Sequence, residues 1–212
     1  MKQFLRKINL VFFVTYVVIF GAEAFSKEQK TRYKQDNVSN YFSGVVLASQ
    51  DNNEEAFTYL NKVQKLKKEH MNFNIKFLRT LVLLEKFDEA FLFSESIWKK
   101  DQVFFEADFL LGINSFIKKD FKSAEKYFLR LNEISRYNIY FEGFLGNVLL
   151  AWSQASQGKK DKSFNTIKKI SNRYENLKQS QNIFLHCYFN SNETQILFEK
   201  LINNEDYNFS RY

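Results

Sequence analysis

Hydrophobic residues recur at three- and four-residue steps along most of the chain, with short polar stretches between the runs. The clearest example lies in residues 105–131, where one run ends at Ile117 and the next begins at Phe121. This spacing is the period of one face of an α-helix. Because only three polar residues separate the two runs, the two helices have to lie antiparallel. The pattern predicts a helical hairpin.

Similar pairs of runs lie on both sides of this segment, and together they predict five helical hairpins within residues 38–203. Glycine occurs six times and proline not at all, so the chain lacks the turn residues that an all-β domain needs. The predicted fold class is all-α, an α-solenoid of antiparallel helical hairpins. The paired runs cover residues 38–49 and 54–68, 72–84 and 88–99, 103–118 and 121–133, 140–157 and 161–174, and 177–189 and 193–202.

Small residues return at a fixed interval in the second helix of the first three hairpins. They are Ala56, Ala90 and Ala124, which are 34 residues apart. Gly44 and Gly112 each precede one of these alanines by twelve residues, and bulky residues follow the alanines by four and seven positions. A period of 34 residues in helix–turn–helix units is that of the tetratricopeptide repeat.

Residues 38–136 therefore resemble the tetratricopeptide repeat family, in which a Leu-Gly pair of the first helix packs against the alanine of the second. Beyond an expected insertion at residues 135–139, Ser163 and Thr194 take the small position of the fourth and fifth hairpins. Residues 204–212 look like the start of a further, incomplete repeat. The alternative is an ordinary helical bundle with coincidental spacing, but the shared phase of the glycines and bulky residues favours the repeat.

The chain departs from the family pattern at two kinds of position. Asn40, Asn74 and Asp108 stand where the family has an aromatic residue at the start of the first helix. Leu78 stands where the neighbouring repeats have glycine, and Ser94 stands where an aromatic residue is expected. Degenerate members of the family keep mainly the core positions, and the resemblance therefore still implies the tetratricopeptide-like superhelical fold.

The resemblance also implies a function: a non-catalytic scaffold that binds a protein or peptide partner along a concave face formed by the first helices. The groove positions are mostly apolar, and the single cation among them does not provide the clamp with which the family holds a C-terminal carboxylate. An apolar face suits an amphipathic helix or an extended apolar segment. The alternatives are that these side chains are buried within the array or used in self-association. The predicted groove residues are Tyr41, Val45, Ile75, Arg79, Phe109, Ile113, Phe116, Val148 and Trp152.

Residues 1–24 have the three parts of a secretory signal peptide. A short basic segment precedes the apolar run 8–20, and small residues follow it at Ala22 and Ala24. We expect cleavage after Ala24, a flexible polar leader over residues 25–37, and export to the periplasm or cell envelope. The alternative is an uncleaved inner-membrane anchor over residues 8–22, because a spanning helix needs ~20 apolar residues. The membrane is expected to be involved only through this segment.

Composition and charge narrow the class of protein. The 212 residues are 45% hydrophobic and 26% charged, and they include 25 Phe and 11 Tyr, which is typical of a globular chain with a substantial core. The net charge is +7, with paired lysines at the predicted helix ends. Cations there suit the helix dipole and solubility. The basic residues do not interleave with aromatics on one face, so no nucleic-acid partner is expected.

No constellation of residues predicts catalysis, and we expect no enzyme activity and no cofactor. Cys187 is the only cysteine, and its neighbour His186 points in another direction on a helix, so neither a disulfide nor a metal site is expected. A buried thiol is the simpler expectation. Phosphate-binding loops and hydrolase motifs do not occur. The alternative function is the helical, substrate-positioning part of an envelope enzyme whose catalytic domain lies beyond Tyr212.

Overall fold

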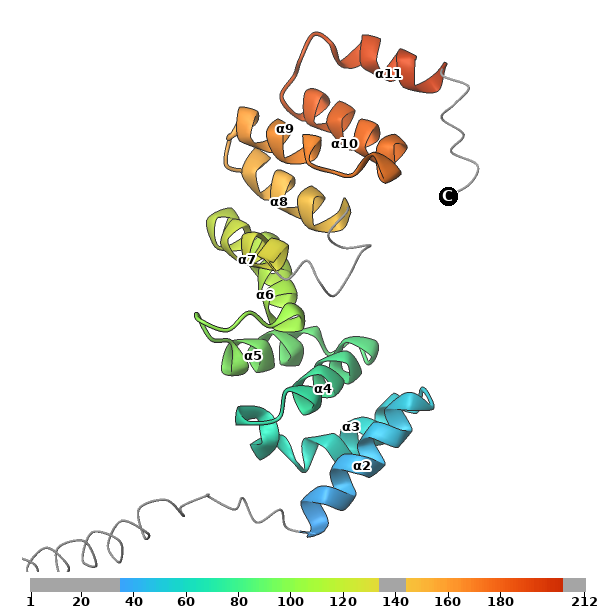
Figure 1. Ribbon diagram of the computed structural model, residues 1–212, viewed down its shortest axis with the longest axis vertical. Coiled ribbons are helices and arrows are strands. Elements are labelled where there is room, and N and C mark those ends of the chain that lie inside the picture. Colours follow the sequence, from blue (N-terminus) through green and yellow to red (C-terminus); the bar gives the residue numbers. More distant parts are fainter. Residues whose placement is uncertain (1–34, 134–143, 204–212) are drawn as a thin grey trace, which may run out of the picture. The chain divides into compact units, whose positions relative to one another are not determined.

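The computed structural model describes residues 35–133 and 144–203, and within these ranges it contains helices and no strand (Figure 1). The chain divides into two compact units, residues 1–40 and 41–212, and α2 begins in the first of them. The predicted signal segment, most of the leader, the insertion at 135–139 and the segment 204–212 lie outside the described residues. The helices are α2 (Gln35–Ser49), α3 (Asn53–Asn61), α4 (Met71–Leu83), α5 (Phe87–Ile97), α6 (Phe105–Ile117), α7 (Phe121–Glu133), α8 (Gly146–Ala155), α9 (Lys160–Lys168), α10 (Glu175–Tyr188) and α11 (Thr194–Ile202).

Consecutive helices form antiparallel pairs, and this confirms the predicted all-α array of helical hairpins. Two second helices are shorter than the hydrophobic pattern suggests. After α3 the chain continues as a 3₁₀ helix, η2 (Gln64–Lys68). After α9 it leaves the helical conformation at Ser171, whose ψ is 141°, and forms the 3₁₀ turn η4 (Asn172–Tyr174). Both departures follow a buried residue seven positions after the small one, Val63 and Ile170, so the helix needs to continue no further to fill the core.

Each hairpin turns on one residue in the left-handed backbone region. These residues have φ between 51° and 74°. In each turn the next residue donates its N–H to a carbonyl five positions earlier, for example Lys86 to Leu81 and Asp120 to Ser115 at 2.9 Å. This is the hydrogen bond of a Schellman C-cap, which ends a helix and reverses the chain. The five turn residues are Asp51, Glu85, Lys119, Gly158 and Asn190.

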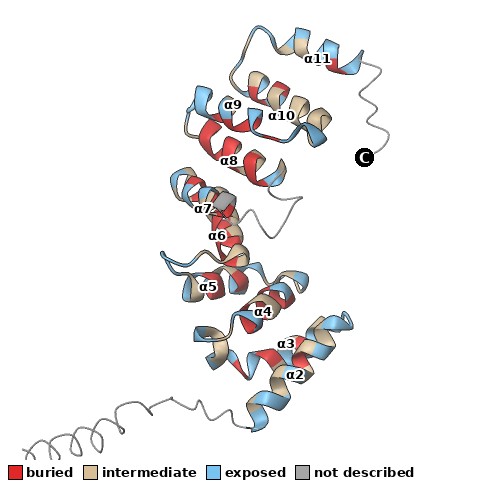
Figure 2. Ribbon diagram, viewed as in Figure 1, coloured by how far each residue is buried: buried red, intermediate tan, exposed pale blue. Residues whose placement is uncertain are grey.

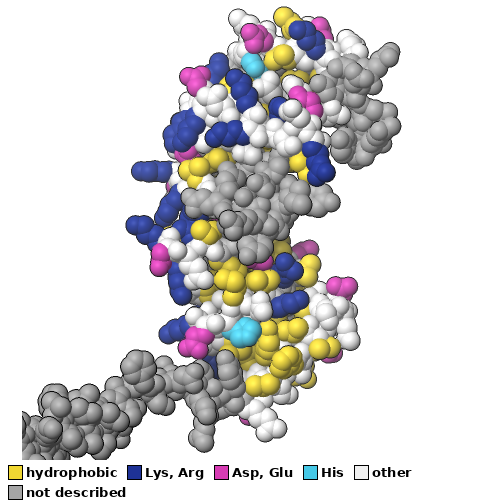
Figure 3. All heavy atoms as spheres, in the orientation of Figure 1, with side chains coloured by type: hydrophobic (Ala, Val, Ile, Leu, Met, Phe, Trp, Pro, Cys, Tyr) yellow, Lys and Arg dark blue, Asp and Glu magenta, His cyan; other side chains and the backbone are white. Residues whose placement is uncertain are grey.

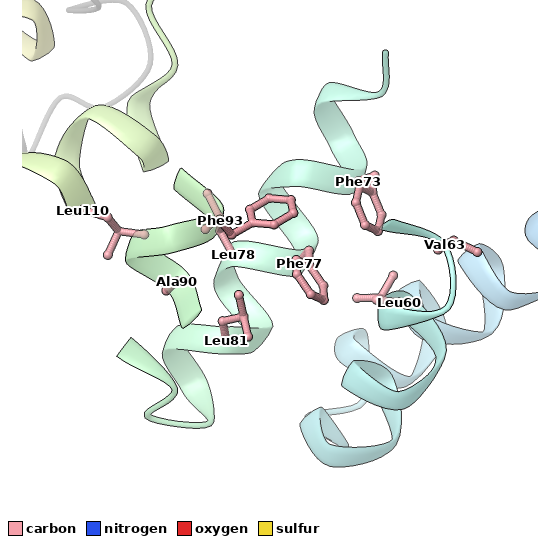
Figure 4. Close-up of a cluster of buried hydrophobic side chains, with 9 residues drawn as sticks. All are labelled: Leu60, Val63, Phe73, Phe77, Leu78, Leu81, Ala90, Phe93 and Leu110. Atoms are coloured by element: carbon pink, nitrogen blue, oxygen red, sulfur yellow. The ribbon is translucent and has the colours of Figure 1, made fainter. Parts of the chain in front are cut away.

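The core consists of three hydrophobic clusters, and each joins one hairpin to the first helix of the next. Buried positions accordingly lie on the facing sides of the helices (Figure 2). Leu110 of α6 packs with the cluster built around α4 and α5 (Figure 4). Leu150 of α8 packs with Phe128 of α7, and Leu185 of α10 packs with Ile167 of α9. Because a hairpin cannot cover its own apolar face, stacking against the next one is what completes the core.

The predicted row of small residues lies at the centre of these interfaces. Ala56, Ala90, Ala124 and Ser163 are all 0% exposed. Thr194, at the corresponding position of the fifth hairpin, is half-buried. The burial of this row shows that the 34-residue period in the sequence marks the helix–helix contact and is no coincidence.

Close approach at the row depends on glycine in the first helix. A Cβ on Gly44 would lie 2.6 Å from Cγ of Leu60, and a Cβ on Gly112 would lie 2.8 Å from Cδ1 of Phe128. Contacts this short require atoms to move. The second hairpin reverses the sizes, since its first helix has the bulky Leu78 and its second helix the small Ser94. Both are buried, so the two departures from the family pattern compensate each other.

Candidate partner-binding face

The predicted groove residues occupy two repeated positions on the first helices, fifteen and eleven residues before the small residue. The positions immediately before them, such as Asn74 and Leu78 in α4, point into the core. The groove residues themselves are exposed or half-buried, and none is buried. The structure thus assigns one side of each first helix to the core and leaves the adjacent side accessible. We call this side the first-helix face; it comprises Tyr41, Val45, Ile75, Arg79, Phe109, Ile113, Phe116, Val148 and Trp152.

Several of these side chains also pack within the array. The ring of Tyr41 lies edge-on to His70 at 4.9 Å, and Phe116 lies edge-on to Phe121 at 5.2 Å. Trp152 donates its indole N–H to Oε1 of Gln181 at 2.8 Å. Tyr41, Phe116 and Trp152 therefore contribute to stability as well as to the accessible face.

Arg79, the single cation of the face, is not free. Its guanidinium lies 3.6 Å from the carboxylate of Glu106 on the next first helix, and its side chain is 64% exposed. An exposed pair of this kind adds little stability, but it partly neutralises the only positive charge. Hydrophobic side chains gather in patches over the middle of the face drawn in Figure 3, while Lys and Arg side chains follow one edge. The face is suited to apolar contact.

The nine residues do not converge on one pocket. They pack against all three hydrophobic clusters in turn, for example Tyr41 against the first, Ile113 against the second and Val148 against the third. Two pockets formed by described residues, one around His186 and one around Asn74, contain none of the nine. The arrangement can offer repeated apolar contacts along a surface, which is what binding of an elongated segment requires.

The sequence reasoning missed a row of buried polar residues sixteen positions before the small residue. Asn74 is 8% exposed, Asp108 is 0% exposed and Asn147 is 9% exposed. They occupy the places at which the family has an aromatic residue, so the departure is a repeated polar position rather than an isolated loss. Polar residues at the same phase in successive repeats were the signal that could have revealed it.

Asp108 shows what such a residue does. Its carboxylate accepts hydrogen bonds from the indole N–H of Trp98 at 2.8 Å, from the backbone N–H of Phe104 at 3.1 Å and from Nε of Arg130 at 2.8 Å. The rest of the Arg130 guanidinium donates to three carbonyls in the loop between α5 and α6, those of Lys99, Lys100 and Gln102. One buried ion pair therefore fixes the connection between the second and third hairpins.

A second buried carboxylate joins the third and fourth hairpins. Glu125 of α7, 5% exposed, lies 2.6 Å from Nζ of both Lys159 and Lys162, and Gln157 donates to it at 2.9 Å. Burial by itself would raise the pKa of Glu125, but the hydrogen bonds from these three side chains outweigh it and lower the pKa to about 2.

This pKa predicts a stability that depends on acid. Because the pKa of Glu125 is lower in the folded chain than its ordinary 4.5, the ionised carboxylate stabilises the fold above pH ~4.5, and this contribution is lost as the pH falls towards ~2. The loss amounts to no more than about 3 kcal/mol. Urea unfolding between pH 7 and 2.5 should show a steeper acid loss in the wild-type chain than in Glu125→Gln. Equal slopes would contradict this assignment.

The chemistry of the remaining polar residues is simple. Cys187 is exposed, which corrects the expectation of a buried thiol: α10 directs Ile183 and Leu185 inward and leaves Cys187 on its outer side. Nδ1 of His186 lies 3.0 Å from Oγ of Ser191, and Nδ1 of His70 caps α4 by accepting the N–H of Phe73. In residues 35–133 and 144–203 no three His, Cys, Asp or Glu side chains lie close enough to hold a metal ion.

Helices able to cross a membrane were also searched for in the described residues, and none is long and apolar enough. The apolar run 8–20 lies outside that search.

Comparison with known proteins supports the fold. No family model and no curated protein matches the sequence. Among solved structures, the chain is similar to a MamA protein, with a TM-score of 0.64 at 15% identity over 81% of this chain and 93% of that one. It is likewise similar to MamA from residue 41 onward of Desulfovibrio magneticus RS-1, with a TM-score of 0.63 at 14% identity over 82% and 97% of the two chains. At this identity the likeness shows a tetratricopeptide-like helical-repeat fold.

Proposed function

We propose that this chain is a non-catalytic scaffold that binds a protein partner on its first-helix face. The observation that carries the proposal is the repetition along that face. In four successive hairpins the same two positions hold accessible side chains, of which all but Arg79 are apolar or aromatic, beside positions that are buried. Surfaces of this kind bind an amphipathic helix or an extended apolar segment. The tetratricopeptide-like fold supports the same class of activity.

The test is to place a charge on this face. Val45→Asp and Ile113→Asp put a carboxylate among half-buried apolar residues of the first helices, where a bound apolar segment would have to desolvate it. We expect the partner that co-purifies with the tagged chain to be lost. The matched controls are Leu92→Asp and Leu129→Asp on the second helices, where the wild-type leucines are 66% and 44% exposed.

A photo-crosslinking amino acid at position 109 should label the same partner, and one at position 129 should not. Thermal unfolding checks that all four charged variants fold equally well. Retention of the partner by the first-helix variants, together with its loss from the controls, would assign binding to the other side of the array.

We also propose that the scaffold acts in the cell envelope after export. The support is the arrangement of basic, apolar and small residues in positions 1–24. Mass spectrometry of the purified chain tests it in the same experiment. A chain that begins at Phe25 indicates export with cleavage, a membrane-bound chain that keeps residues 8–22 indicates an anchor, and a full-length chain in the cytoplasmic fraction contradicts both.

A further inference from the structure

A pocket of about 450 Å³ lies between the second hairpin and the loops at its ends. One wall comes from η2 and the start of α4, with His70, Met71 and Asn74; the other comes from the end of α5, with Ser96 and Trp98. His70 also packs against Tyr41, so the pocket adjoins the first-helix face at that residue.

The pocket contains an unsatisfied buried acceptor. Asn74 is 8% exposed, and its Nδ2 donates to the carbonyl of Lys67 at 3.0 Å, which fixes the orientation of the amide. Its Oδ1 is buried and accepts no hydrogen bond from any described residue. A buried acceptor without a partner costs free energy that a ligand with an N–H or O–H group would recover.

The next hairpin shows how the same place is filled. Asp108 and Arg130 lie 34 residues after Asn74 and Ser96, and there the guanidinium occupies the space, bonded to the carboxylate and 4.8 Å from the centre of the Trp98 ring. In the second hairpin an uncharged amide replaces the carboxylate and a short serine replaces the arginine. The pocket is therefore the site of an ion pair from which the arginine is missing.

The surroundings decide which guest fits. Lys67, Lys68 and Lys99 line the pocket against a single carboxylate, Glu69, so a cation is disfavoured and an anion is attracted. Trp98 and Phe104 provide an aromatic wall. A ligand that matches has a hydrogen-bond donor close to a negative charge, which is the arrangement of a backbone N–H and a side-chain carboxylate in one acidic residue.

We infer that this pocket, the Asn74 pocket, binds an acidic residue within a peptide, with the peptide N–H on Oδ1 of Asn74 and the carboxylate among the three lysines. The inference rests on the proposed function to the extent that the peptide belongs to the protein partner. It adds a selective polar contact beside an apolar face that provides area but little specificity.

The probe is the blocked tripeptide acetyl-Ala-Glu-Ala-amide, titrated into the ¹⁵N-labelled full chain. We expect shifts of the Asn74 side-chain amide and the Trp98 indole signals. N-methylation of the glutamate amide removes the donor and should weaken binding about fivefold. Replacement of glutamate by glutamine should weaken it by a few-fold, and this difference should shrink in high salt because the lysines are near the surface.

Two variants test the site in the protein. Ser96→Arg introduces the guanidinium that the third hairpin has at this place, and we expect it to abolish the peptide-induced shifts without lowering the melting temperature. Lys99→Ala should weaken binding, whereas the control Lys122→Ala, at an exposed lysine of α7 outside the pocket, should not. Unchanged binding by Ser96→Arg, or equal binding of the parent and N-methylated peptides, would overturn the inference.

The two proposals fail separately. If Val45→Asp and Ile113→Asp lose the partner while the tripeptide perturbs neither Asn74 nor Trp98, the face binds a partner and the pocket does not. If the tripeptide binds and the charged variants keep the partner, the pocket stands and the first-helix face is wrong.

Discussion

Replacing Arg130 with alanine should lower the free energy of unfolding by about 3–5 kcal/mol, the cost of removing one partner of a buried ion pair. The carboxylate of Asp108 would stay fully buried with two hydrogen bonds instead of three and no positive charge beside it. Three carbonyls of the α5–α6 loop would lose their donors at the same time. Equilibrium unfolding in urea, monitored by circular dichroism, measures the loss.

Two comparisons separate the buried charge from the stacking on Trp98. Lys126 also lies 4.8 Å from the Trp98 ring centre but is exposed, so Lys126→Ala should cost no more than about 1 kcal/mol. Adding Asp108→Asn to Arg130→Ala removes the unpaired charge and should restore part of the stability, since it recreates the neutral arrangement of Asn74. A loss below ~1 kcal/mol in Arg130→Ala would show that the pair is not a main determinant of stability.

The hairpins themselves could be predicted because the information is local and repeated. Apolar residues at helical spacing mark each helix, and the 34-residue phase marks which small residues meet at the contact. That phase correctly placed even Ser163, which follows the expected insertion. Which side of each first helix stays accessible also follows from the phase. Whether a partner binds there does not, since an accessible apolar side looks the same in the sequence with or without one.

The buried polar row could not be predicted because its partners are distant. Nothing in the helical period distinguishes a buried aspartate from an exposed one, and Arg130 lies 22 residues after Asp108. The turns were hidden for a different reason. Only Gly158 is a typical left-handed residue, whereas Glu85 and Lys119 adopt the same backbone conformation at φ 57° and 61°. There the Schellman hydrogen bonds and the packing of the two helices override the residue preference.

The size exchange between the second and third hairpins leads to the other large effect. Gly112→Leu should be strongly destabilising, because even a Cβ at this position would lie 2.8 Å from Cδ1 of Phe128, whose ring is 0% exposed and has no room to move. Phe128→Ser should cost about 3–5 kcal/mol through the cavity it creates. Both single variants are measured by urea unfolding against the wild-type chain.

The double variant Gly112→Leu with Phe128→Ser tests whether the two positions act as one unit. It copies Leu78 and Ser94, which are buried at the corresponding places of the second hairpin at 1% and 0% exposure. The leucine then fills the space that the ring leaves, so the double variant should be more stable than either single variant, with a coupling energy of about 2 kcal/mol or more. Gly112→Ala, which adds only the Cβ, should be milder, at ~1–3 kcal/mol. Additive losses in the double variant would mean that each hairpin is packed for its own residues, and that the small and bulky positions are not interchangeable between repeats.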